Sequence, residues 1–367
     1  MTRRTMLVLA AGIAAVSAPT IATATMVYVA PPAKGSSTSW VMVANDDGSN
    51  PVKVVAGTAA SISPDGSRVA YQVWSPKQDN PTSKVRDLAS GATAVLTGTC
   101  QPGVLPWSPD STLLACATQT ANAKGFVTGN GLGLAQIPAS LEGVSSIPVG
   151  NYIPAPGNAV VYGVAFSPDS TQIAFSLMKF GSRAAAGTLY VAPVTNATAR
   201  TAVLARAAAP VWSTSGIAAM QITNVTVTFN GARTPMVHTQ IWTISPDLSS
   251  KKQLTHYKAS GLMAGPGPVA WSPSGNMVFG FISGQDHLGM ATFRVPGGAM
   301  TTLFSSASGS GSLQTAVAVS ADGKRLLYTA GSEDTPAAIK TTSLTGRGTR
   351  TLVSRALTVS VTPNWNG

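Results

Sequence analysis

Charged side chains are scarce in this chain. They make up 10% of its 367 residues, whereas soluble domains usually carry about 25%. Glutamate occurs only twice, while glycine and proline supply 36 and 25 residues. An apolar share of 44% excludes a disordered charged tail, and the abundant glycine and proline exclude a coiled coil. No apolar run of about 20 residues follows residue 24, so we expect no membrane span in the mature protein.

Groups that catalyse reactions or bind metals are also few. The chain has three histidines, His238, His256 and His287, and the predicted strands place them apart from one another. Glu142 and Glu333 have no evident carboxylate partner for acid–base chemistry. The sequence contains neither the Gly-x-Ser-x-Gly motif of hydrolases nor a phosphate-binding loop. We therefore expect no cofactor, no metal and no enzymatic activity.

The first 24 residues are predicted to be a signal peptide that is cleaved after Ala24. Arg3 and Arg4 give a positive start, Met6 to Val16 is apolar, and small residues precede the cleavage point. The paired arginines fit general export and twin-arginine export alike. The mature protein, residues 25–367, is then periplasmic or secreted.

The two cysteines, Cys100 and Cys116, are predicted to form a disulfide bond. An even number of cysteines is typical of disulfide bonding in an exported chain. They flank a predicted hairpin whose arms contain Trp107 and Leu113. Antiparallel pairing about its turn places Cys116 opposite residue 103, close to Cys100.

The formal net charge of +11 indicates what kind of partner to expect. A basic surface favours anionic partners such as envelope polymers or acidic proteins. Nucleic acid is not expected, because no dense run of lysine and arginine is interleaved with aromatic side chains.

The clearest feature of the sequence is an internal repeat in which an apolar residue and a serine precede a turn and an apolar strand. Six copies are SISPDGSRVAY at 61–71, PWSPDSTLLAC at 106–116, AFSPDSTQIAF at 165–175, VWSTSGIAAM at 211–220, AWSPSGNMVFG at 270–280 and AVSADGKRLLY at 318–328. TPNWNG at 362–367 resembles a degraded seventh copy. Aligned on the apolar residue before the turn, the copies are 45 to 59 residues apart at Ile62, Trp107, Phe166, Trp212, Trp271, Val319 and Trp365.

The turn of each repeat has a structural explanation. Proline presets the backbone for the first central position, and a glycine such as Gly66 or Gly323 supplies a left-handed position. Aspartate recurs at the next position of the turn. We therefore assign these aspartates to the turn rather than to catalysis: Asp65, Asp110, Asp169 and Asp322.

Repeats of roughly 40–50 residues built from short strands are typical of β-propellers, and four strands per repeat make one antiparallel blade. Met26 to Ala30, Trp40 to Ala44 and Val52 to Val55 resemble the second to fourth strands of a blade without its first. Val359 to Trp365 resembles the missing first strand. Pairing of the two ends predicts an all-β, closed seven-bladed propeller, with six blades as the alternative.

At these residues the sequence resembles the TolB-like β-propeller family, whose repeats carry a Trp-Ser-Pro-Asp-Gly turn before a short apolar strand. The best copies are Trp107 to Asp110 and Phe166 to Asp169, and Val211 to Gly216 is the poorest. The resemblance implies a propeller over most of residues 25–367. Such blades also occur in prolyl-oligopeptidase-type peptidases and in some lyases. We expect neither the hydrolase domain of those peptidases nor the separate N-terminal domain of TolB, and so no full TolB function.

The loops between second and third strands and between blades are predicted to share one end of the propeller, called here the long-loop face. It comprises residues 74–84, 117–131, 145–159, 221–239, 257–267 and 283–288. Long loops on a rigid scaffold often carry binding, and aromatic side chains mixed with lysine and arginine suit an anionic polymer or a protein. The candidate binding residues are Trp74, Lys77, Lys124, Phe126, Tyr152, Lys179, Phe180, Arg183, Arg233, Tyr257 and Lys258. A hairpin over 225–237 is predicted to project as a docking arm or a lid.

These features predict an exported, non-catalytic and monomeric β-propeller that binds a protein or an anionic envelope polymer through the long-loop face. One alternative is a propeller lyase or hydrolase acting on an anionic polysaccharide, which needs polar groups converging near the central channel. Another is a structural surface protein that associates with itself.

Overall fold

The computed structural model describes most of the chain from residue 25 onward. The described residues are 25–74, 81–97, 106–121, 127–153, 159–179, 186–229, 232–258, 265–284, 287–307, 313–332 and 335–361. Within these ranges the protein is all-β, with strands β1 to β27 and one short 3₁₀ helix, η1 (Ala197–Ala199). No helix in these ranges could span a membrane. The predicted signal peptide lies outside them and remains a prediction.

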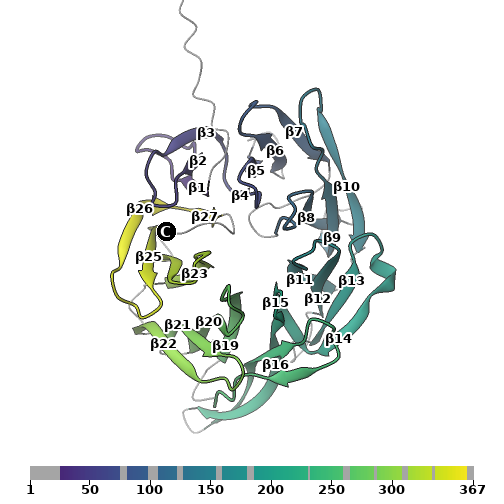
Figure 1. Cartoon of the computed structure of the whole chain (residues 1–367), viewed down its shortest axis with the longest axis vertical. Helices are drawn as coiled ribbons and strands as arrows, with labels where there is room; N and C mark the ends of the chain where they lie inside the picture. The colour runs from purple at the N-terminus through teal and green to yellow at the C-terminus, as the bar shows by residue number, and fades with distance from the viewer. Residues whose placement is uncertain are drawn as a thin grey trace, which may run out of the picture.

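The strands form a ring of mostly antiparallel sheets around a central axis (Figure 1). Three separate four-stranded sheets follow chain order from one edge to the other. They are β15 (Ala207–Ser213), β16 (Gly216–Phe229), β17 (Ala232–Ile244) and β18 (Lys251–Gln253); β19 (Gly265–Trp271), β20 (Met277–Gly284), β21 (His287–Arg294) and β22 (Met300–Ala307); and β23 (Leu313–Val319), β24 (Arg325–Ser332), β25 (Thr335–Ser343) and β26 (Arg350–Ala356).

An eleven-stranded sheet makes up another part of the ring. Its strands are β4 (Ala60–Ile62), β5 (Arg68–Val73), β6 (Thr82–Asp87), β7 (Thr93–Thr97), β8 (Leu113–Ala121), β9 (Val127–Gln136), β10 (Ser146–Ile153), β11 (Ala159–Phe166), β12 (Gln172–Lys179), β13 (Ala186–Pro193) and β14 (Thr201–Ala205). Within it, β4 to β7 and β11 to β14 are antiparallel runs of four strands. Parallel contacts of β7 with β10 and of β9 with β11 join these runs to β8–β10.

The two ends of the described chain meet in the last sheet. It consists of β27 (Thr358–Val361), β1 (Met26–Ala30), β2 (Trp40–Ala44) and β3 (Val52–Ala56), in that order. β27 runs antiparallel to β1, with Val361 opposite Met26. The Ile62 amide donates to Ser360 Oγ over 3.4 Å, which ties β27 to the following sheet as well. The predicted pairing of the N- and C-terminal strands is confirmed.

The register of this pairing corrects one part of the repeat alignment. Val361 lies opposite Met26, and Phe166 has the same register with Ile173 in its own hairpin. A Thr-Pro-Asn sequence follows Val361 where Ser-Pro-Asp follows Phe166. The residue equivalent to Phe166 is therefore Val361, and the alignment on Trp365 is wrong. Tryptophan stands at the equivalent position in three other copies, so the sequence alone favours Trp365.

The turns between first and second strands are held by their own serine and aspartate. Ser63 Oγ donates to Asp65 Oδ1 over 2.5 Å and accepts the Arg68 amide over 2.9 Å. The same two bonds recur at Ser108, Ser167 and Ser320. The prediction that these aspartates belong to the turn is confirmed.

The same chemistry closes a turn that lies outside the repeat alignment. Between β17 and β18, Ser245 Oγ donates to Asp247 Oδ1 over 2.6 Å and accepts the Ser250 amide over 2.9 Å. This turn connects a third strand to a fourth, at the outer edge of its sheet.

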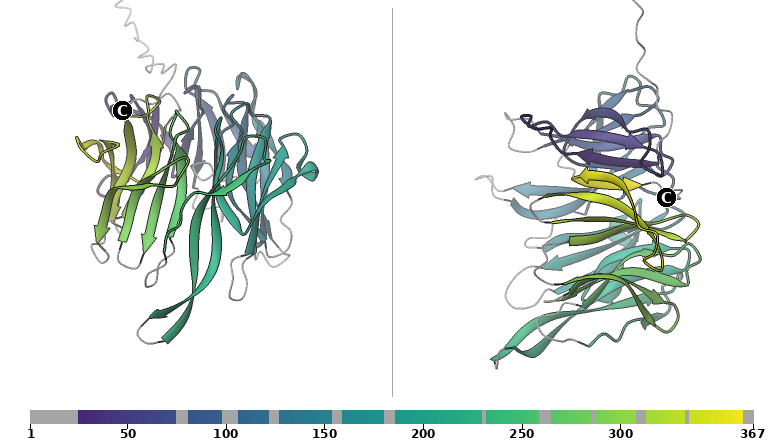
Figure 2. Two further views of the ribbon diagram at one scale, coloured as in Figure 1. Left: turned by 60° about the horizontal axis from the view of Figure 1, so that its bottom comes forward. Right: turned by 90° about the vertical axis from the view of Figure 1, so that its left-hand side faces the viewer.

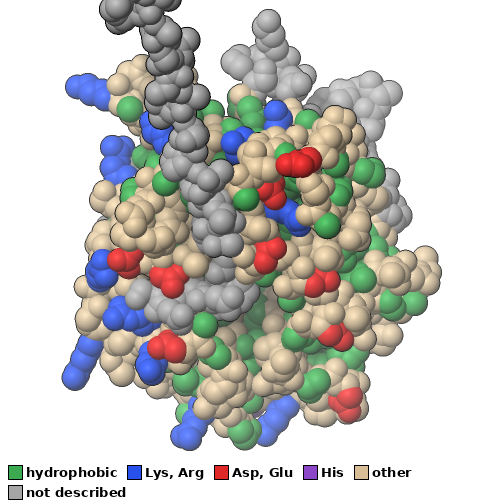
Figure 3. Space-filling view, turned by 45° about the horizontal axis from the view of Figure 1, so that its top comes forward, with side chains coloured by type: hydrophobic (Ala, Val, Ile, Leu, Met, Phe, Trp, Pro, Cys, Tyr) green, Lys and Arg blue, Asp and Glu red, His purple; other side chains and the backbone are tan. Residues whose placement is uncertain are grey.

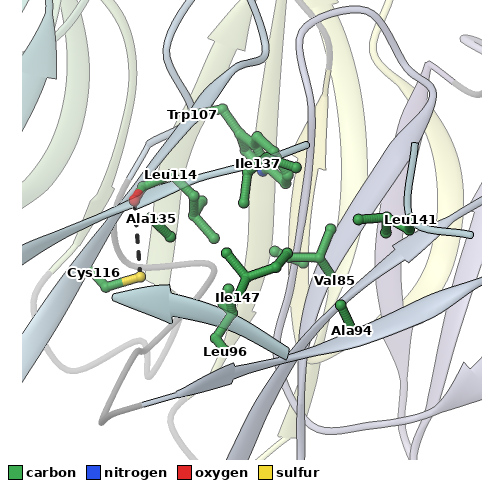
Figure 4. Packing of buried hydrophobic residues seen from close by; sticks show 11 residues of the cluster. Val85, Ala94, Leu96, Trp107, Leu114, Cys116, Ala135, Ile137, Leu141 and Ile147 are labelled. Carbon is green, nitrogen blue, oxygen red and sulfur yellow. Dashed lines mark hydrogen bonds between the residues drawn. The ribbon is translucent and has the colours of Figure 1, made fainter. Parts of the chain in front are cut away.

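The hydrophobic cores lie between neighbouring sheets, and Figure 4 shows the one around Trp107. Its Nε1 donates to Ser61 Oγ over 3.1 Å, a bond from one repeat to the preceding one. Cys116 is fully buried in this cluster and lies opposite Gly133 of β9. No free cysteine occurs in the described part of the chain. The predicted partner, Cys100, lies outside it, so the disulfide remains a prediction.

Candidate functional site

A crevice opens between the β15–β18 sheet and the β19–β22 sheet. Its volume is about 410 Å³, within the range of ligand-binding pockets. One wall is the segment Leu254–Lys258, which follows β18, and the other is the turn Gly297–Met300, with Phe293 between them. β18 and β22 are the last strands of their sheets, so the crevice lies on the outer side of the ring.

Gln240 holds the first wall in place. Its Nε2 donates to the Tyr257 carbonyl over 2.6 Å, and its Oε1 accepts the Tyr257 amide over 2.9 Å. The same Oε1 accepts the Thr255 hydroxyl over 2.7 Å, and that hydroxyl accepts the Ile241 amide over 2.8 Å. One buried side chain thus adds to the backbone hydrogen bonds that the Leu254 and Thr255 amides still donate to the Ile241 carbonyl.

His238 supports the Tyr257 ring from behind. The two rings stack with centroids 6.4 Å apart and an interplanar angle of 23°. His238 is 7% exposed, and this burial lowers its pKa, so the imidazole is neutral at neutral pH. A neutral ring can be buried here without a counter-ion, and it limits the positions that Tyr257 can take.

The second wall depends on glycine. Gly298 has φ +67°, and a Cβ added to it would lie 1.7 Å from the Leu254 carbonyl oxygen. Only glycine lets the turn of one sheet approach the wall of the other so closely. The fully buried Phe293 forms the floor, and Met300 is 46% exposed at the rim.

The chemistry of the crevice favours an anionic ligand. Lys258 and His256 are exposed, Tyr257 is partly exposed, and no carboxylate occurs among the described lining residues. A lysine ammonium pairs with a carboxylate or phosphate, and an aromatic ring packs against a sugar or an apolar group. In the described ranges no group of three His, Cys, Asp or Glu side chains could hold a metal ion.

The structure brings two of the candidate binding residues together, Tyr257 and Lys258. Trp74 is 56% exposed just after β5, and Arg233 is exposed on β17 opposite Thr228. Lys179 ends β12, and its side chain is not described. Five further candidates lie outside the described residues: Lys77, Lys124, Phe126, Phe180 and Arg183.

Tyr152 is engaged within the protein. Its hydroxyl donates to the Pro193 carbonyl over 2.5 Å, and its ring meets Phe175 edge-on with centroids 6.5 Å apart. Burial raises the pKa of its hydroxyl to about 12. The ring therefore helps to join β10 to the β11–β14 strands. A hydroxyl with a backbone acceptor so close has little capacity left for a ligand.

The hairpin predicted over 225–237 is confirmed as the outer part of β16 and β17, with Phe229 opposite Ala232. β15 reaches only to Gln221 and β18 only to Trp242, so beyond these residues the two strands pair with each other alone. The resulting ribbon projects well past the other strands (Figure 2).

Comparison with known proteins identifies the fold. No family model and no curated protein matches the chain. A prolyl endopeptidase structure is similar over 93% of this chain, with a TM-score of 0.64 and 12% identity, and the chain spans 50% of its length. The β-propeller domain of the Trilobed protease from Pyrococcus furiosus is similar over 91% of this chain and 93% of that domain, with a TM-score of 0.60 and 9% identity.

A third similar structure is an oligogalacturonate lyase in complex with manganese, with a TM-score of 0.56 and 12% identity over 91% of this chain and 86% of the lyase. TolB structures are also among the matches. At identities this low, the likenesses bear on architecture and not on activity. The predicted propeller architecture is confirmed: the chain is a β-propeller, similar in architecture to the propellers of these peptidases and of the lyase.

Proposed function

We propose that this protein is an exported, non-catalytic β-propeller that binds a protein or an anionic envelope polymer. The observation that carries the proposal is the crevice beside Tyr257, where Lys258 and His256 stand at the mouth of a pocket without described carboxylates. The Gln240 bonds and the His238 stack fix the Tyr257 wall before any ligand arrives. Such preorganisation lowers the entropy that binding costs.

An acidic sugar polymer fits this site best. A uronic acid carboxylate can pair with Lys258 while its ring packs on Tyr257 and Met300. The formal charge of +11 raises the local concentration of a polyanion around the whole protein. The exposed Arg233 lies on β17, a strand of one of the two sheets that form the crevice, and adds a further cation to this side of the protein.

Seven blades and export belong to the same proposal. Six blades are the four-stranded sheets and runs described above, and β8 to β10 with the segment at Trp107 supply the seventh. The basic start and apolar stretch of residues 1–24 support export to the periplasm or the medium, where the Cys100–Cys116 bridge could form. We further propose that the mature protein, residues 25–367, is a monomer.

The lyase or hydrolase reading remains the second candidate, because one similar fold belongs to an oligogalacturonate lyase. A lyase or hydrolase would release shorter sugar chains with new reducing ends, whereas a binding protein would not. Incubation of the mature protein with polygalacturonate, with and without manganese, should leave the number of reducing ends unchanged. New reducing ends would contradict the non-catalytic proposal.

Calorimetric titration of the mature protein with polygalacturonate, and with neutral dextran as a control, tests the binding site. We expect polygalacturonate alone to bind. Lys258→Ala and Tyr257→Ala should each weaken binding by about tenfold or more, because each removes a partner from the ligand. Lys252→Ala is the matched control, since Lys252 is exposed on β18 but does not line the crevice.

Equal losses in the Lys252 and Lys258 variants would place binding elsewhere on the basic surface and contradict the site. If polygalacturonate does not bind, the proposal requires an envelope protein as the ligand. Affinity capture from envelope extract tests this: the wild-type protein should retain a protein that the Lys258→Ala variant does not retain.

A further inference from the structure

A second cavity lies on the central axis, and it shares no lining residue with the crevice. Its volume is about 450 Å³. Five consecutive repeats contribute the residue that precedes their first turn, and these residues are Trp107, Phe166, Trp212, Trp271 and Val319. Turn residues Pro109, Pro273 and Ala321 also line it, so it opens at the end of the propeller that carries the Ser-Asp turns. None of its described lining residues is charged.

The inner strands are shaped for this cavity. β11, β15, β19 and β23 each carry a β-bulge a few residues before the turn. A bulge bends its strand and changes the direction of the side chains. The four bulges occur at matching places in neighbouring repeats, so they change the inner strands in the same way. β15, β19 and β23 are end strands of their sheets, so their free edges face the axis. Pro106 and Pro210 in the lining remove amide donors from that surface.

Two tryptophan rings are locked across the boundaries between repeats. Trp107 Nε1 donates to Ser61 Oγ over 3.1 Å, and Trp271 Nε1 donates to the Val211 carbonyl over 3.2 Å. Both are less than one-tenth exposed, whereas Trp212 is only partly buried. The cavity therefore has fixed aromatic walls and one more accessible ring.

Carboxylates stand around this apolar cavity. Asp65, Asp110 and Asp169 are exposed in three successive turns that contact one another, since the Asp65 amide donates to Ser111 Oγ and the Asp110 amide to Ser170 Oγ, each over 3.1 Å. Figure 3 shows acidic side chains spread around a hollow in which hydrophobic side chains are visible. Asp322 completes the set, with Lys324 3.5 Å from its Oδ2.

These carboxylates are ionised at neutral pH. A hydrogen bond from Ser167 is the main cause that lowers the pKa of Asp169. At Asp110, partial burial acts in the opposite direction, but bonds from Ser108 and Thr112 outweigh it and the pKa is again lowered. The hydrogen bonds that Asp110 and Asp169 accept from their own turns all end on Oδ1.

We propose that this axial cavity binds an extended protein segment in which lysine or arginine alternates with proline or other apolar residues. Aromatic-lined surfaces bind proline-rich extended segments, because such segments lose little entropy on binding. The negative turns complement the cations of such a segment, which also gain from the aromatic faces. The carboxylates lie on separate repeats, so an extended segment can reach several of them while a single small cation cannot. This site prefers the opposite charge to the crevice and does not depend on it.

Fluorescence anisotropy with labelled ten-residue peptides tests the proposal on the mature protein. The probes are a Pro–Arg repeat, a Gly–Arg repeat of equal charge and a neutral Pro–Ser repeat. The Pro–Arg peptide should bind at least about tenfold more tightly than either of the others. In the Trp212→Ala variant, the Pro–Arg peptide should bind no more tightly than the Gly–Arg peptide, because its higher affinity comes from contact with the apolar wall.

The double variant Asp110→Asn with Asp169→Asn should weaken Pro–Arg binding about tenfold, while the amide oxygen keeps the turn hydrogen bonds. The matched control is Asp247→Asn, since Asp247 has the same turn chemistry at an outer edge. It should leave the affinity unchanged. Melting curves and polygalacturonate binding of all variants check that the fold and the crevice are intact.

Equal affinity for the Pro–Arg and Gly–Arg peptides would overturn the proposal in favour of non-specific attraction. Equal affinity for the Pro–Arg and Pro–Ser peptides would show that the carboxylates are not used. The proposal would also be overturned if Asp247→Asn weakened Pro–Arg binding as much as the Asp110 and Asp169 double variant does, or if the Pro–Arg peptide did not bind at all.

Discussion

Aspartate in this protein serves chiefly as a hydrogen-bond acceptor within turns. Five of them accept the hydroxyl of the serine two positions earlier: Asp65, Asp110, Asp169, Asp247 and Asp322. The bond from Ser245 is the main cause that lowers the pKa of Asp247 from 3.8 to about 2. A carboxyl whose pKa is lowered by folding stabilises the folded state above its unfolded pKa, and this contribution is lost as pH falls through the folded value.

These carboxylates should therefore make the melting temperature fall between about pH 4 and pH 2, in addition to a decline below pH 6.5 that the lowered pKa of the buried His238 should cause. Asp247→Asn removes one of these titrating carboxyls and should make that fall shallower. Circular dichroism melts of both proteins at about pH 5, 3 and 2 measure the difference. A variant whose melting temperature drops with pH as steeply as that of the wild type would contradict the assignment.

At the scale of the element, the crevice exists because a strand ends early. β18 has three residues. The Leu254 and Thr255 amides still donate to the Ile241 carbonyl, and beyond them the Gln240 side chain binds both backbone groups of Tyr257. The segment that Gln240 supports leaves the β15–β18 sheet, and its Leu254 carbonyl meets Gly298 of the β19–β22 sheet.

Gln240→Ala should destabilise the protein by about 1–3 kcal/mol, because the Tyr257 amide and carbonyl lose buried partners. Urea unfolding measures this change. Gln221→Ala is the control, since Gln221 makes a single exposed bond to the Ala205 carbonyl over 3.3 Å, and its cost should stay within about 0.5 kcal/mol. Equal costs for the two variants would show that Gln240 does not hold the wall.

The turns and the meeting of the chain ends could be predicted from the sequence, because both depend on residues close together or on a count of strands. The crevice could not. Gln240 meets Tyr257 seventeen positions later, and Gly298 comes from another sheet, so no local pattern links them. Tyr257 and Lys258 were predictable only as aromatic and basic loop residues. The same criterion also predicts Tyr152 as a binding residue, although its hydroxyl donates to the Pro193 carbonyl.

At the scale of the whole molecule, the ring is joined where β27 meets β1. β27 covers the edge of β1 and also contacts Ile62 of the next sheet, so its loss exposes an unpaired strand beside a buried core.

A protein that ends at Ala356 should melt more than about 5 °C below the full mature protein and should associate as its concentration rises. Scanning fluorimetry and size-exclusion chromatography measure the two effects. A control that ends at Val361 keeps β27 and should behave as the full mature protein does. An unchanged melting temperature without β27 would contradict its structural importance.

The meeting of β27 with β1 also sets the order in which the protein can mature. The Ile62 to Ser360 bond spans 298 positions, so the first sheet waits for almost the entire chain to be synthesised. During translation, β1 to β3 lack their partner strand β27 until the last residues of the chain have been made. Non-local pairing of this kind is slow and leaves edges open to other chains. We therefore expect the incomplete chain to bind a chaperone until its last strand emerges.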